Sequence, residues 1–341
     1  MDEAARAQAR MICSPKAGPE LLNVLIIGCG NIAGGFDATG GDLILTHAGA
    51  YRRHGRFHLA ACVEPDAAKR EAFRMRWGVQ DAFAELSQAL GSGSRYDVVS
   101  ICSPTTQHGD HLRMVLEARP RLVFCEKPIT TDLDMASDLV AAYHAVGVPL
   151  AINHTRRWDP QVVQFKSALQ SGDWGTVRSV VGHYNKGILN NGSHMVDLLQ
   201  YLLGPLRLLA AGDARIDYSA EDPTVPALLS SSQDVPIHLV GGAASDYAFF
   251  EAQFVTEKGV VAIEQGGFSW RQRIVKPSPH FPGYRVVGDD AMLRGRYGEA
   301  MLCAAANLYD AVTTGTVLAS TGESALAAQS LCNEIRLRAR R

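Results

Sequence analysis

The chain has 341 residues, of which 47% are hydrophobic and 20% charged, so it is long enough for two domains and too apolar for a disordered protein. The formal net charge is −2 and no block of lysine or arginine stands out, which argues against nucleic acid or an anionic membrane as a partner. No apolar run reaches the length that spans a bilayer.

The first twenty residues are typical of a flexible tail. They begin acidic, contain Pro15 and Pro19, and lack the apolar core of an export signal. The seven cysteines are odd in number and form no C-x-x-C pair, a pattern typical of reduced thiols in a cytoplasmic protein. We therefore expect residues 1–20 to be a tail on a cytoplasmic protein.

The glycine-rich turn after the first apolar run predicts a dinucleotide site. The run NVLIIG leads into Gly28-x-Gly30-x-x-Ala33. Gly28 allows a tight turn, Gly30 presents bare backbone to a pyrophosphate, and Ala33 is small enough for close helix–strand packing. A helix that begins here would direct its N-terminus at the phosphates, so Asn31 and Ile32 are expected beside the cofactor as well.

An acid after the second apolar run indicates which dinucleotide is bound. The run FHLAACV is followed by Glu64, which could bind both hydroxyls of an adenosine ribose and would repel a 2′-phosphate. We therefore expect NAD rather than NADP, although Glu64 could instead be a solvated loop acid. Glu64 lies 36 residues after Gly28, and a Gly-rich stretch over residues 34–47, before a helix over 48–55, accounts for this long spacing.

Strand and helix patterns then alternate as far as residue 154. Predicted helices cover residues 67–78, 105–120 and 131–147, and predicted strands cover residues 96–104, 121–128 and 148–154. This alternation predicts a doubly wound parallel sheet, whose ligands bind at the carboxyl ends of the strands. That edge should hold Ser103 and Pro104, Glu126 and Lys127, and the segment 153–157.

Lys127 follows an apolar strand and precedes Pro128, which restricts the backbone. An ammonium group there could stabilise a developing alkoxide and orient the nicotinamide ribose. The alternative is an ordinary solvated lysine. Glu126 is expected to contact the cofactor, or else to pair with a basic residue.

The segment HTRRWDP, residues 154–160, joins the two halves of the chain. Arg156 and Arg157 could each bind a phosphate or carboxylate through two hydrogen bonds, and Trp158 offers a stacking face. We expect Arg156 to bind substrate, and we favour a structural role for Arg157 and Trp158.

The stretch SHMVDLLQYLLGP predicts an amphipathic helix with a histidine in its first turn, capped by Ser193 and ended by Gly204. Its apolar stripe comprises Met195, Leu198, Leu199, Leu202 and Leu203. The partial positive charge of a helix N-terminus disfavours imidazolium, so a neutral His194 could accept the proton of a sugar hydroxyl. Asp197, one turn on, could orient the ring or bind a second hydroxyl. Alternatively, His194 only bonds a neighbouring carbonyl.

Alternating patterns predict an open, mainly antiparallel sheet after residue 176, with strands over 177–187, 206–219, 247–259, 260–265 and 268–276. Helices over 160–172, 193–203, 302–312 and 325–337 are expected to cover one face. Tyr184 and Lys186 are expected at the mouth of a cleft, where either could bind substrate hydroxyls or phosphates.

Three motifs follow one another along the chain: the glycine turn, CEKP at residues 125–128 and GSHMVD at residues 192–197. Their order and spacing resemble those of the glucose–fructose oxidoreductase / inositol dehydrogenase / MocA (Gfo/Idh/MocA) family. SPTTQHGDHLRMVLEA, which contains His108, resembles the family segment that lines the nicotinamide. The resemblance runs from about Leu21 to Leu331. It implies an α/β protein with a doubly wound Rossmann domain over 21–155 and a substrate-binding and oligomerisation domain over 156–341, which carries a large, mainly antiparallel open sheet.

The resemblance also implies nicotinamide-dependent oxidation or reduction of a sugar or cyclitol hydroxyl. Lys127 matches the family lysine that contacts substrate and nicotinamide ribose, and His194 matches the catalytic histidine. The family often has an aspartate four residues before that histidine, whereas this chain has Asn190. An amide cannot exchange a proton as a carboxylate does, and relatives that act on nucleotide-linked sugars also resemble this chain in having asparagine there. Asn190 is thus expected at the catalytic site as a substrate contact.

We therefore expect an NAD-dependent dehydrogenase or ketoreductase for a sugar, nucleotide-linked and used in surface carbohydrate synthesis. In this family the C-terminal sheet typically forms a homodimer or homotetramer. Two alternatives stay open: a redox-neutral enzyme of the glycosidase or epimerase type, and a non-catalytic sugar or NAD sensor. The remaining histidines lack the spacing of metal ligands, so no metal is expected.

Overall fold

The computed structural model describes residues 20–38, 41 and 43–340, so residues 1–19 of the predicted tail lie outside it. The chain divides into two compact units. The first contains the chain up to Pro160 together with Gly298–Leu326, and the second contains Gln161–Tyr297 and the chain from Ala327 onwards.

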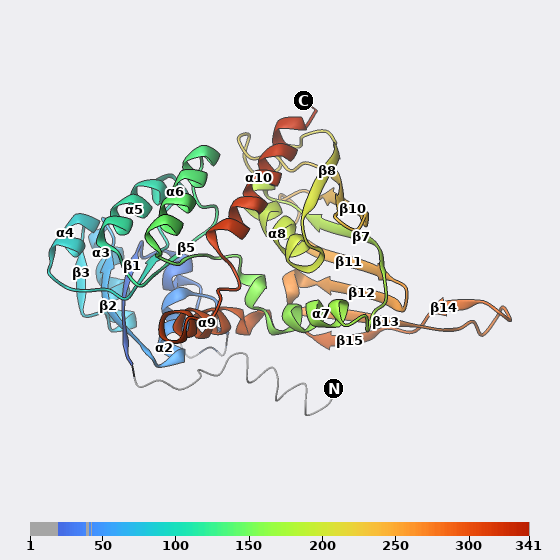
Figure 1. The fold of residues 1–341 in the computed structure, drawn as a ribbon, viewed down its shortest axis with the longest axis horizontal. Coiled ribbons are helices and arrows are strands. Elements are labelled where there is room, and N and C mark those ends of the chain that lie inside the picture. The colour runs from blue at the N-terminus through green and yellow to red at the C-terminus, as the bar shows by residue number, and fades with distance from the viewer. Residues whose placement is uncertain (1–19, 39–40, 42, 341) are drawn as a thin grey trace. The chain divides into compact units, whose positions relative to one another are not determined.

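The first unit is built on a parallel sheet (Figure 1), as the alternating pattern predicts. Its described strands are β1 (Leu22–Ile27), β2 (Phe57–Val63), β3 (Asp81–Phe83), β4 (Val98–Ile101), β5 (Leu122–Cys125) and β6 (Leu150–Ile152). Their order is β3-β2-β1-β4-β5-β6. β4 and β5 are buried at every position, which is why they appear in the sequence as continuous apolar runs.

Helices cover both faces of this sheet. They are α2 (His47–His54), α3 (Ala67–Trp77), α4 (Leu86–Gly91), α5 (Thr105–Ala118), α6 (Leu133–Val146) and α9 (Ala300–Thr314). One apolar cluster joins alternate β1 residues to α2 and α9, and another joins the intervening β1 residues to α5 and α6. The fold class of this half is therefore the predicted one.

α9 lies in a different unit from the one predicted. The sequence analysis assigns residues 302–312 to the cover of the C-terminal sheet and ends the Rossmann domain at residue 155. In the structure Leu308 and Tyr309 of α9 pack with Tyr51 of α2 in the core of the first unit. An Ala-rich apolar helix can cover either sheet, so its pattern alone does not say which one it joins.

The second unit contains a mixed, mostly antiparallel sheet in the order β14-β13-β12-β11-β7-β10-β9-β8, with β15 paired to β13. Its strands are β7 (Val177–Tyr184), β8 (Leu206–Ala211), β9 (Ala227–Ser231), β10 (Pro236–Gly241), β11 (Phe250–Thr256), β12 (Gly259–Glu264), β13 (Ser269–Pro277), β14 (Arg285–Val287) and β15 (Ala291–Arg294). β9 and β10 were not predicted, and β10 pairs parallel to β7.

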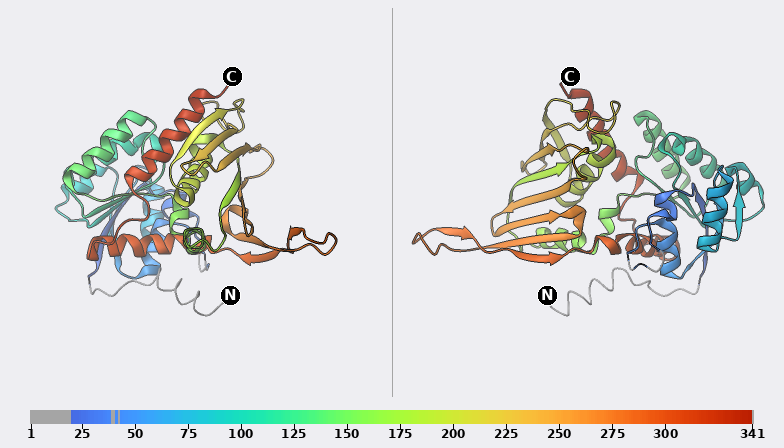
Figure 2. Two further views of the ribbon diagram at one scale, coloured as in Figure 1. Left: turned by 45° about the vertical axis from the view of Figure 1, so that its right-hand side comes forward. Right: turned by 180° about the vertical axis from the view of Figure 1, so that it is seen from behind.

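The helices of the second unit are α7 (Pro160–Gln170), α8 (Gly192–Leu203) and the part of α10 (Gly322–Arg338) after Leu326. Figure 2 shows α8 and α10 along one face of the sheet, where Leu198, Leu331 and Phe254 share a core. No described helix lies along the other face in these views. None of the helices described is long and apolar enough to cross a membrane.

Cysteine chemistry follows the prediction at five positions. Cys29, Cys62, Cys102, Cys125 and Cys332 carry free thiols. Cys303 is disulfide-bonded, so the prediction of reduced thiols throughout is wrong at this residue.

His54, the last residue of α2, is expected to make the first unit acid-sensitive. Its ring packs against Phe57 and Tyr309, with centroids 5.1 and 5.2 Å away, and neither ring nitrogen has a partner among the described residues. Burial and then the charge of Arg56 lower the pKa of His54 to about 4. The unfolded chain binds a proton below pH ~6.5 and the folded chain does not, so stability is lost as the pH falls through this range.

His54→Phe should therefore reduce the loss of unfolding free energy between pH 8 and pH 5 by about 2 kcal/mol. Urea titrations at the two pH values measure it. The matched control is His144→Phe at an exposed position of the same unit, which should leave the loss unchanged. Equal pH dependence of His54→Phe and the unmodified protein would contradict this assignment.

Candidate functional site

The predicted cofactor residues lie together at one edge of the parallel sheet. Ile27 of β1 pairs with Val63 of β2 and with Ile101 of β4, and the pairing continues to Cys125 of β5. The residues that follow these strand ends are Gly28, Glu64, Ser103, Glu126 and Lys127. The crossovers change direction between β1 and β4, which is the switch point where such sheets bind ligands.

The glycine turn has the geometry that the motif requires. Gly28 has φ +89°, and a Cβ atom there would lie 2.7 Å from the Ser103 nitrogen. Its N–H donates to the Val63 carbonyl at 2.8 Å. Gly30 is exposed and a Cβ there would meet no atom within 4 Å, so the chain leaves space that a pyrophosphate could fill. Ala33 is fully buried, as predicted.

The element after the turn is short. Asn31–Gly35 forms a single π-helical turn that ends at Phe36, and the next helix begins only at His47. Gly34 and Gly35 disfavour a longer helix. The predicted Gly-rich stretch lies between this turn and α2, and its residues 39, 40 and 42 lie outside the described part. Asp37, near its start, accepts hydrogen bonds from two residues near its end: from the Leu45 nitrogen at 2.7 Å and from the Thr46 hydroxyl at 2.5 Å. The phosphates would therefore face one turn and not a long helix.

Glu64 is fixed against the glycine turn. One carboxylate oxygen accepts a hydrogen bond from the Cys29 nitrogen at 3.0 Å, and the other accepts one from the Asp66 nitrogen at 3.2 Å. The side chain is half-buried. Glu64 is therefore held against the glycine turn, unlike a solvated loop acid, and its contact with an adenosine ribose stays a prediction.

His108 joins two loops of the site. Its ring is buried, with Nδ1 2.9 Å from the Pro128 oxygen and Nε2 2.9 Å from the Ser103 oxygen. The Ser103 hydroxyl lies 2.9 Å from Nδ1 of His111, whose pKa is lowered by burial and then by His108. Backbone oxygens lie beside both of its nitrogens, so His108 links the Ser103 loop to the Lys127–Pro128 turn, and its contact with the cofactor stays a prediction.

A buried network holds Glu126. His47 Nε2 and Asn153 Nδ2 lie 2.9 and 2.6 Å from the same Glu126 oxygen, and His47 is fully buried. Burial raises the pKa of Glu126, but the hydrogen bond and charge of His47, then the Asn153 hydrogen bond and the charge of Lys127, outweigh it and leave the pKa below its usual value. The alternative that Glu126 pairs with a basic residue thus agrees with the structure, and the favoured contact with the cofactor stays a prediction.

Sequence reasoning missed His47. It lies 79 residues before Glu126, and no local spacing connects the two. The sequence offers one signal for it: His47 stands at the start of α2, directly after the N-cap Thr46. A polar ring that is buried at such a position needs a hydrogen-bond partner. His47 therefore acts on the cofactor edge through Glu126.

The histidine segment of the second unit is well ordered by hydrogen bonds. A π-helical turn, Gly187–Asn191, precedes α8, and Asp222 accepts the N–H groups of Leu189 and Asn190 at 2.7 and 2.9 Å. α8 begins at Gly192, so its N-cap is Asn191 and not the predicted Ser193, whose hydroxyl instead donates to the Asn190 carbonyl at 2.9 Å. His194 is the third residue of the helix.

Burial along α8 follows the predicted stripe. Met195, Leu198 and Leu199 are fully buried, and His194 is half-buried. Asp197 is buried at 1% exposure, one turn after His194. Asn190 lies in the turn before α8 and Asp197 lies one turn after His194 along the helix, and a shared catalytic role for the three residues stays a prediction.

The structure corrects the predicted position of Tyr184. It was predicted at the mouth of a cleft, but its side chain is 0% exposed. Its hydroxyl donates to the Val225 carbonyl at 2.7 Å and accepts from the Val225 nitrogen at 2.9 Å, and burial raises its pKa. Tyr184 therefore belongs to the core of the second unit. Lys186 is half-buried, with φ +64° and its N–H bonded to Asp217 at 2.9 Å.

The joining segment is mainly structural, as favoured for Arg157 and Trp158. The indole N–H of Trp158 donates to Asn307 at 2.9 Å and its ring packs edge-on against Phe124. Arg157 donates to the Ala319 carbonyl at 3.2 Å. Arg156 is buried.

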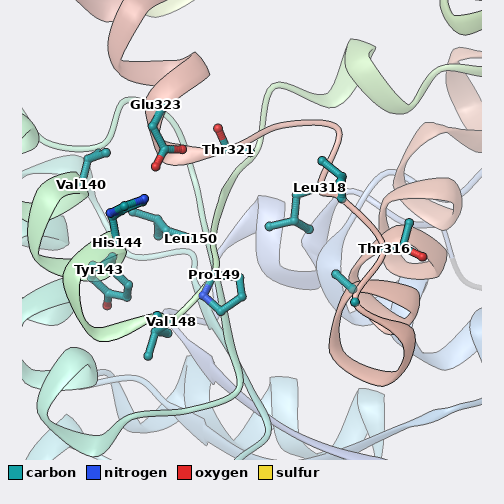
Figure 3. Close-up of a pocket in the computed structure, with 15 residues that line it drawn as sticks. Val140, Tyr143, His144, Val148, Pro149, Leu150, Thr316, Leu318, Thr321 and Glu323 are labelled. Carbon is teal, nitrogen blue, oxygen red and sulfur yellow. The ribbon is translucent and has the colours of Figure 1, made fainter.

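A separate surface pocket of about 430 Å³ lies in the first unit, where α6 turns into β6 and α10 begins. Figure 3 shows His144, Glu323 and Thr321 around an opening that Pro149 and Leu318 also line. β6 starts at this pocket, so it lies at the opposite end of the strands from the glycine turn. Neither here nor elsewhere among the described residues do three His, Cys, Asp or Glu side chains cluster as metal ligands.

Comparison with known proteins agrees with this geometry. A family described as "Oxidoreductase family, NAD-binding Rossmann fold" matches residues 22–154. The inositol 2-dehydrogenase of Rhizobium meliloti is 24% identical over 309 residues, which cover 84% of this chain and 91% of the relative. The matches to an uncharacterised oxidoreductase of Bacillus subtilis and to D-apiose dehydrogenase of Paraburkholderia graminis span only 23% and 53% of those proteins.

Two solved structures share the fold of nearly the whole chain. The dehydrogenase WlbA from Bordetella pertussis, in complex with NADH and UDP-GlcNAcA, has a TM-score of 0.77 and 20% identity and covers 95% of this chain and 96% of its own. The 3-ketoreductase KijD10 from Actinomadura kijaniata, in complex with NADP and TDP-benzene, has a TM-score of 0.75 and 20% identity, covering 94% and 98%. At this identity the likeness shows the fold alone.

Proposed function

Because the chain belongs to the Gfo/Idh/MocA oxidoreductase family, we propose that it moves a hydride between a nicotinamide and a hydroxyl or keto carbon of a nucleotide-linked sugar. Such a sugar is used in surface carbohydrate synthesis. The observation that carries the proposal is the edge of the parallel sheet, where the glycine turn, Glu64 and the Glu126–Lys127 turn follow neighbouring strands.

The cofactor in this proposal is NAD. The chain belongs to an NAD(P)-binding fold, and similar structures hold either NADH or NADP. The Glu64 carboxylate, fixed by the Cys29 nitrogen at 3.0 Å, favours a ribose with free hydroxyls over one with a 2′-phosphate. The cofactor would lie along Gly28, Gly30 and Ser103 and supply the hydride acceptor when bound.

The proton and the charge are assigned to residues of this chain. In the oxidation direction the imidazole of His194, in the first turn of α8, accepts the hydroxyl proton. Lys127 stabilises the alkoxide that forms. In the reduction direction His194 returns the proton to the new hydroxyl. Asn190 and Asp197 contact other substrate hydroxyls or orient the His194 ring.

Arg156 and Lys186 are assigned to the diphosphate and sugar of the substrate, as cationic partners for phosphate oxygens. The support is the asparagine at position 190 and the nucleotide-linked ligands named for the two similar structures. Tyr184 is left out of this set because its hydroxyl is used in the core.

We further propose a homodimer or homotetramer through the C-terminal sheet. Val181 and Val255 alternate with core residues, so they point to the face away from α8. That face carries no described helix in Figure 2, and a second copy of it would bury these side chains. Light scattering of the purified protein measures the assembly.

The nicotinamide absorbance of the purified protein, followed with a panel of UDP- and TDP-linked sugars and their keto forms, tests the function. We expect one member of the panel to change it with turnover, with NAD(H) preferred over NADP(H). Turnover with free cyclitols only would contradict the nucleotide-linked substrate. If the cofactor co-purifies and the sugar is altered without a net change in absorbance, the redox-neutral alternative would be favoured. If NAD is bound and no sugar reacts, a sensor would be favoured.

A further inference from the structure

One loop of the second unit binds every backbone N–H of the turn before α8. The turn covers residues 186–190, and the loop covers residues 217–224. Five consecutive N–H groups donate to this loop: Lys186 to the Asp217 carboxylate at 2.9 Å, Gly187 to the Thr224 hydroxyl at 2.9 Å, Ile188 to the Pro223 carbonyl at 3.0 Å, and Leu189 and Asn190 to the Asp222 carboxylate at 2.7 and 2.9 Å. These N–H groups are thus used within the protein, so the turn recognises a substrate through its side chains.

The 217–224 loop is itself anchored. Arg215 and Thr224 exchange two backbone hydrogen bonds, at 3.0 and 2.9 Å, which close the base of the loop. Thr224 is fully buried, and its hydroxyl donates to the Asp217 carboxylate at 2.7 Å. Asp222 uses both of its carboxylate oxygens on neighbouring N–H groups of the turn. The loop therefore presents its acceptors at fixed positions.

The backbone of the turn has a shape that needs this support. Lys186 and Gly187 both have a positive φ, of +64° and +84°. A residue with a side chain adopts the left-handed region at a cost in free energy, and such strain persists where the surrounding contacts fix the backbone. At Gly187 a Cβ atom would collide with the Asp222 carboxylate, so glycine is what lets this carboxylate approach. Strained segments that are fixed in this way cluster at functional sites.

The turn also carries residues that are assigned to the reaction. Lys186 and Asn190 belong to it, and His194 is the third residue of α8, which begins two residues after Asn190. A shift of the turn would therefore move the substrate contacts and the start of the helix together. A displacement of about 1 Å at such a site can cost about 100-fold in rate.

We propose that Asp222 is a positioning residue, which aligns Lys186, Asn190 and His194 with the sugar by holding the turn before α8. This role rests on the proposed function. Asp222 acts through the backbone N–H groups of Leu189 and Asn190, with the rest of the 217–224 loop, and takes no part in proton transfer.

Asp222→Asn keeps the size of the side chain but leaves one acceptor oxygen for two N–H groups, because the amide NH₂ cannot accept a hydrogen bond. We expect kcat/KM for the sugar identified in the panel to fall by about 10–100-fold, through a higher KM as well as a lower kcat. The Kd of NADH should stay within about twofold, since the cofactor is assigned to the other unit. Glu221→Gln, at the exposed neighbouring acid of the same loop, is the matched control and should keep all of these values.

Hydrogen exchange of the cofactor-free protein measures the turn without any substrate. The amides of residues 186–190 should exchange slowly in the unmodified protein and about tenfold faster in Asp222→Asn. Gly187→Ala, whose methyl group would displace the same carboxylate, should reproduce the faster exchange and the kinetic change. Gly172→Ala, in the same unit, has a positive φ of +75° with open space around it, so it should reproduce neither.

A kcat of Asp222→Asn that falls only in proportion to the folded fraction, measured by circular dichroism, with an unchanged KM would show an ordinary structural acid and overturn the proposal. Faster exchange with unchanged kcat and KM would overturn it as well, and so would unchanged exchange of residues 186–190. Unmodified protein that converts no sugar would contradict the proposed function and this role of Asp222 with it. Slow exchange of the turn would then place the fault in the assigned reaction and not in the hold of the loop.

Discussion

His194→Ala should lower kcat by about 10²–10⁴-fold with the sugar identified in the panel, because the hydroxyl then has no base within the site. Binding of NADH should stay within about twofold of the unmodified protein, since His194 is assigned to the proton and the cofactor is assigned to the glycine turn of the other unit. Stopped-flow absorbance of the nicotinamide measures the first quantity and fluorescence of bound NADH the second.

The structure offers a matched control for this variant. His238 lies on β10 of the same unit, exposed and pointing away from the core residues Ile237 and Leu239. His238→Ala should keep the full rate. Added imidazole should restore part of the rate of His194→Ala by replacing the lost base, which a merely structural histidine would not allow. Full activity of His194→Ala on a genuine substrate would remove His194 from the mechanism.

Gly30→Ala should weaken NADH binding by about 10–100-fold with little change in the stability of the protein. A Cβ atom at Gly30 meets nothing within 4 Å in the protein, and its φ of −81° suits any residue. The methyl group would instead occupy the space assigned to the pyrophosphate, and overpacking of this kind costs about 1–3 kcal/mol. Fluorescence titration with NADH gives the affinity, and urea unfolding of the cofactor-free protein gives the stability.

Gly28→Ala is the comparison that isolates the cofactor. There the methyl group would lie 2.7 Å from the Ser103 nitrogen at φ +89°, so this variant should lose stability without any cofactor present. Gly55→Ala, at a helix end with open space, controls for the strain of a positive φ alone. Unchanged NADH affinity of Gly30→Ala would show that no pyrophosphate approaches this turn.

The parallel sheet and its ligand edge can be predicted because the signals are local. The apolar runs of β4 and β5 are buried on both faces, and the residues at the strand ends follow each run directly. Gly28 and Ala33 are fixed by sterics that a short motif records. The stripe of α8 follows from helical periodicity.

Other features depend on partners far away in the chain. His47 meets Glu126 across 79 residues, and Asp222 holds the turn before α8 across more than 30, so no spacing rule finds either. α9 is apolar enough for either sheet. The burial of Tyr184, by contrast, could have been predicted from the sequence. Every second residue of a strand points to the same face, so Tyr184 shares the core face of β7 with Val180 and Gly182.

The central claim is that the protein transfers a hydride between a nicotinamide and a nucleotide-linked sugar. The most direct measurement incubates the protein with NADH carrying deuterium at C4 and the keto sugar from the panel, followed by mass spectrometry of the sugar. The account predicts one deuterium in the product for each NADH consumed, and none with His194→Ala on the same timescale. A sugar that is converted without gaining deuterium, while NADH stays unchanged, would contradict it.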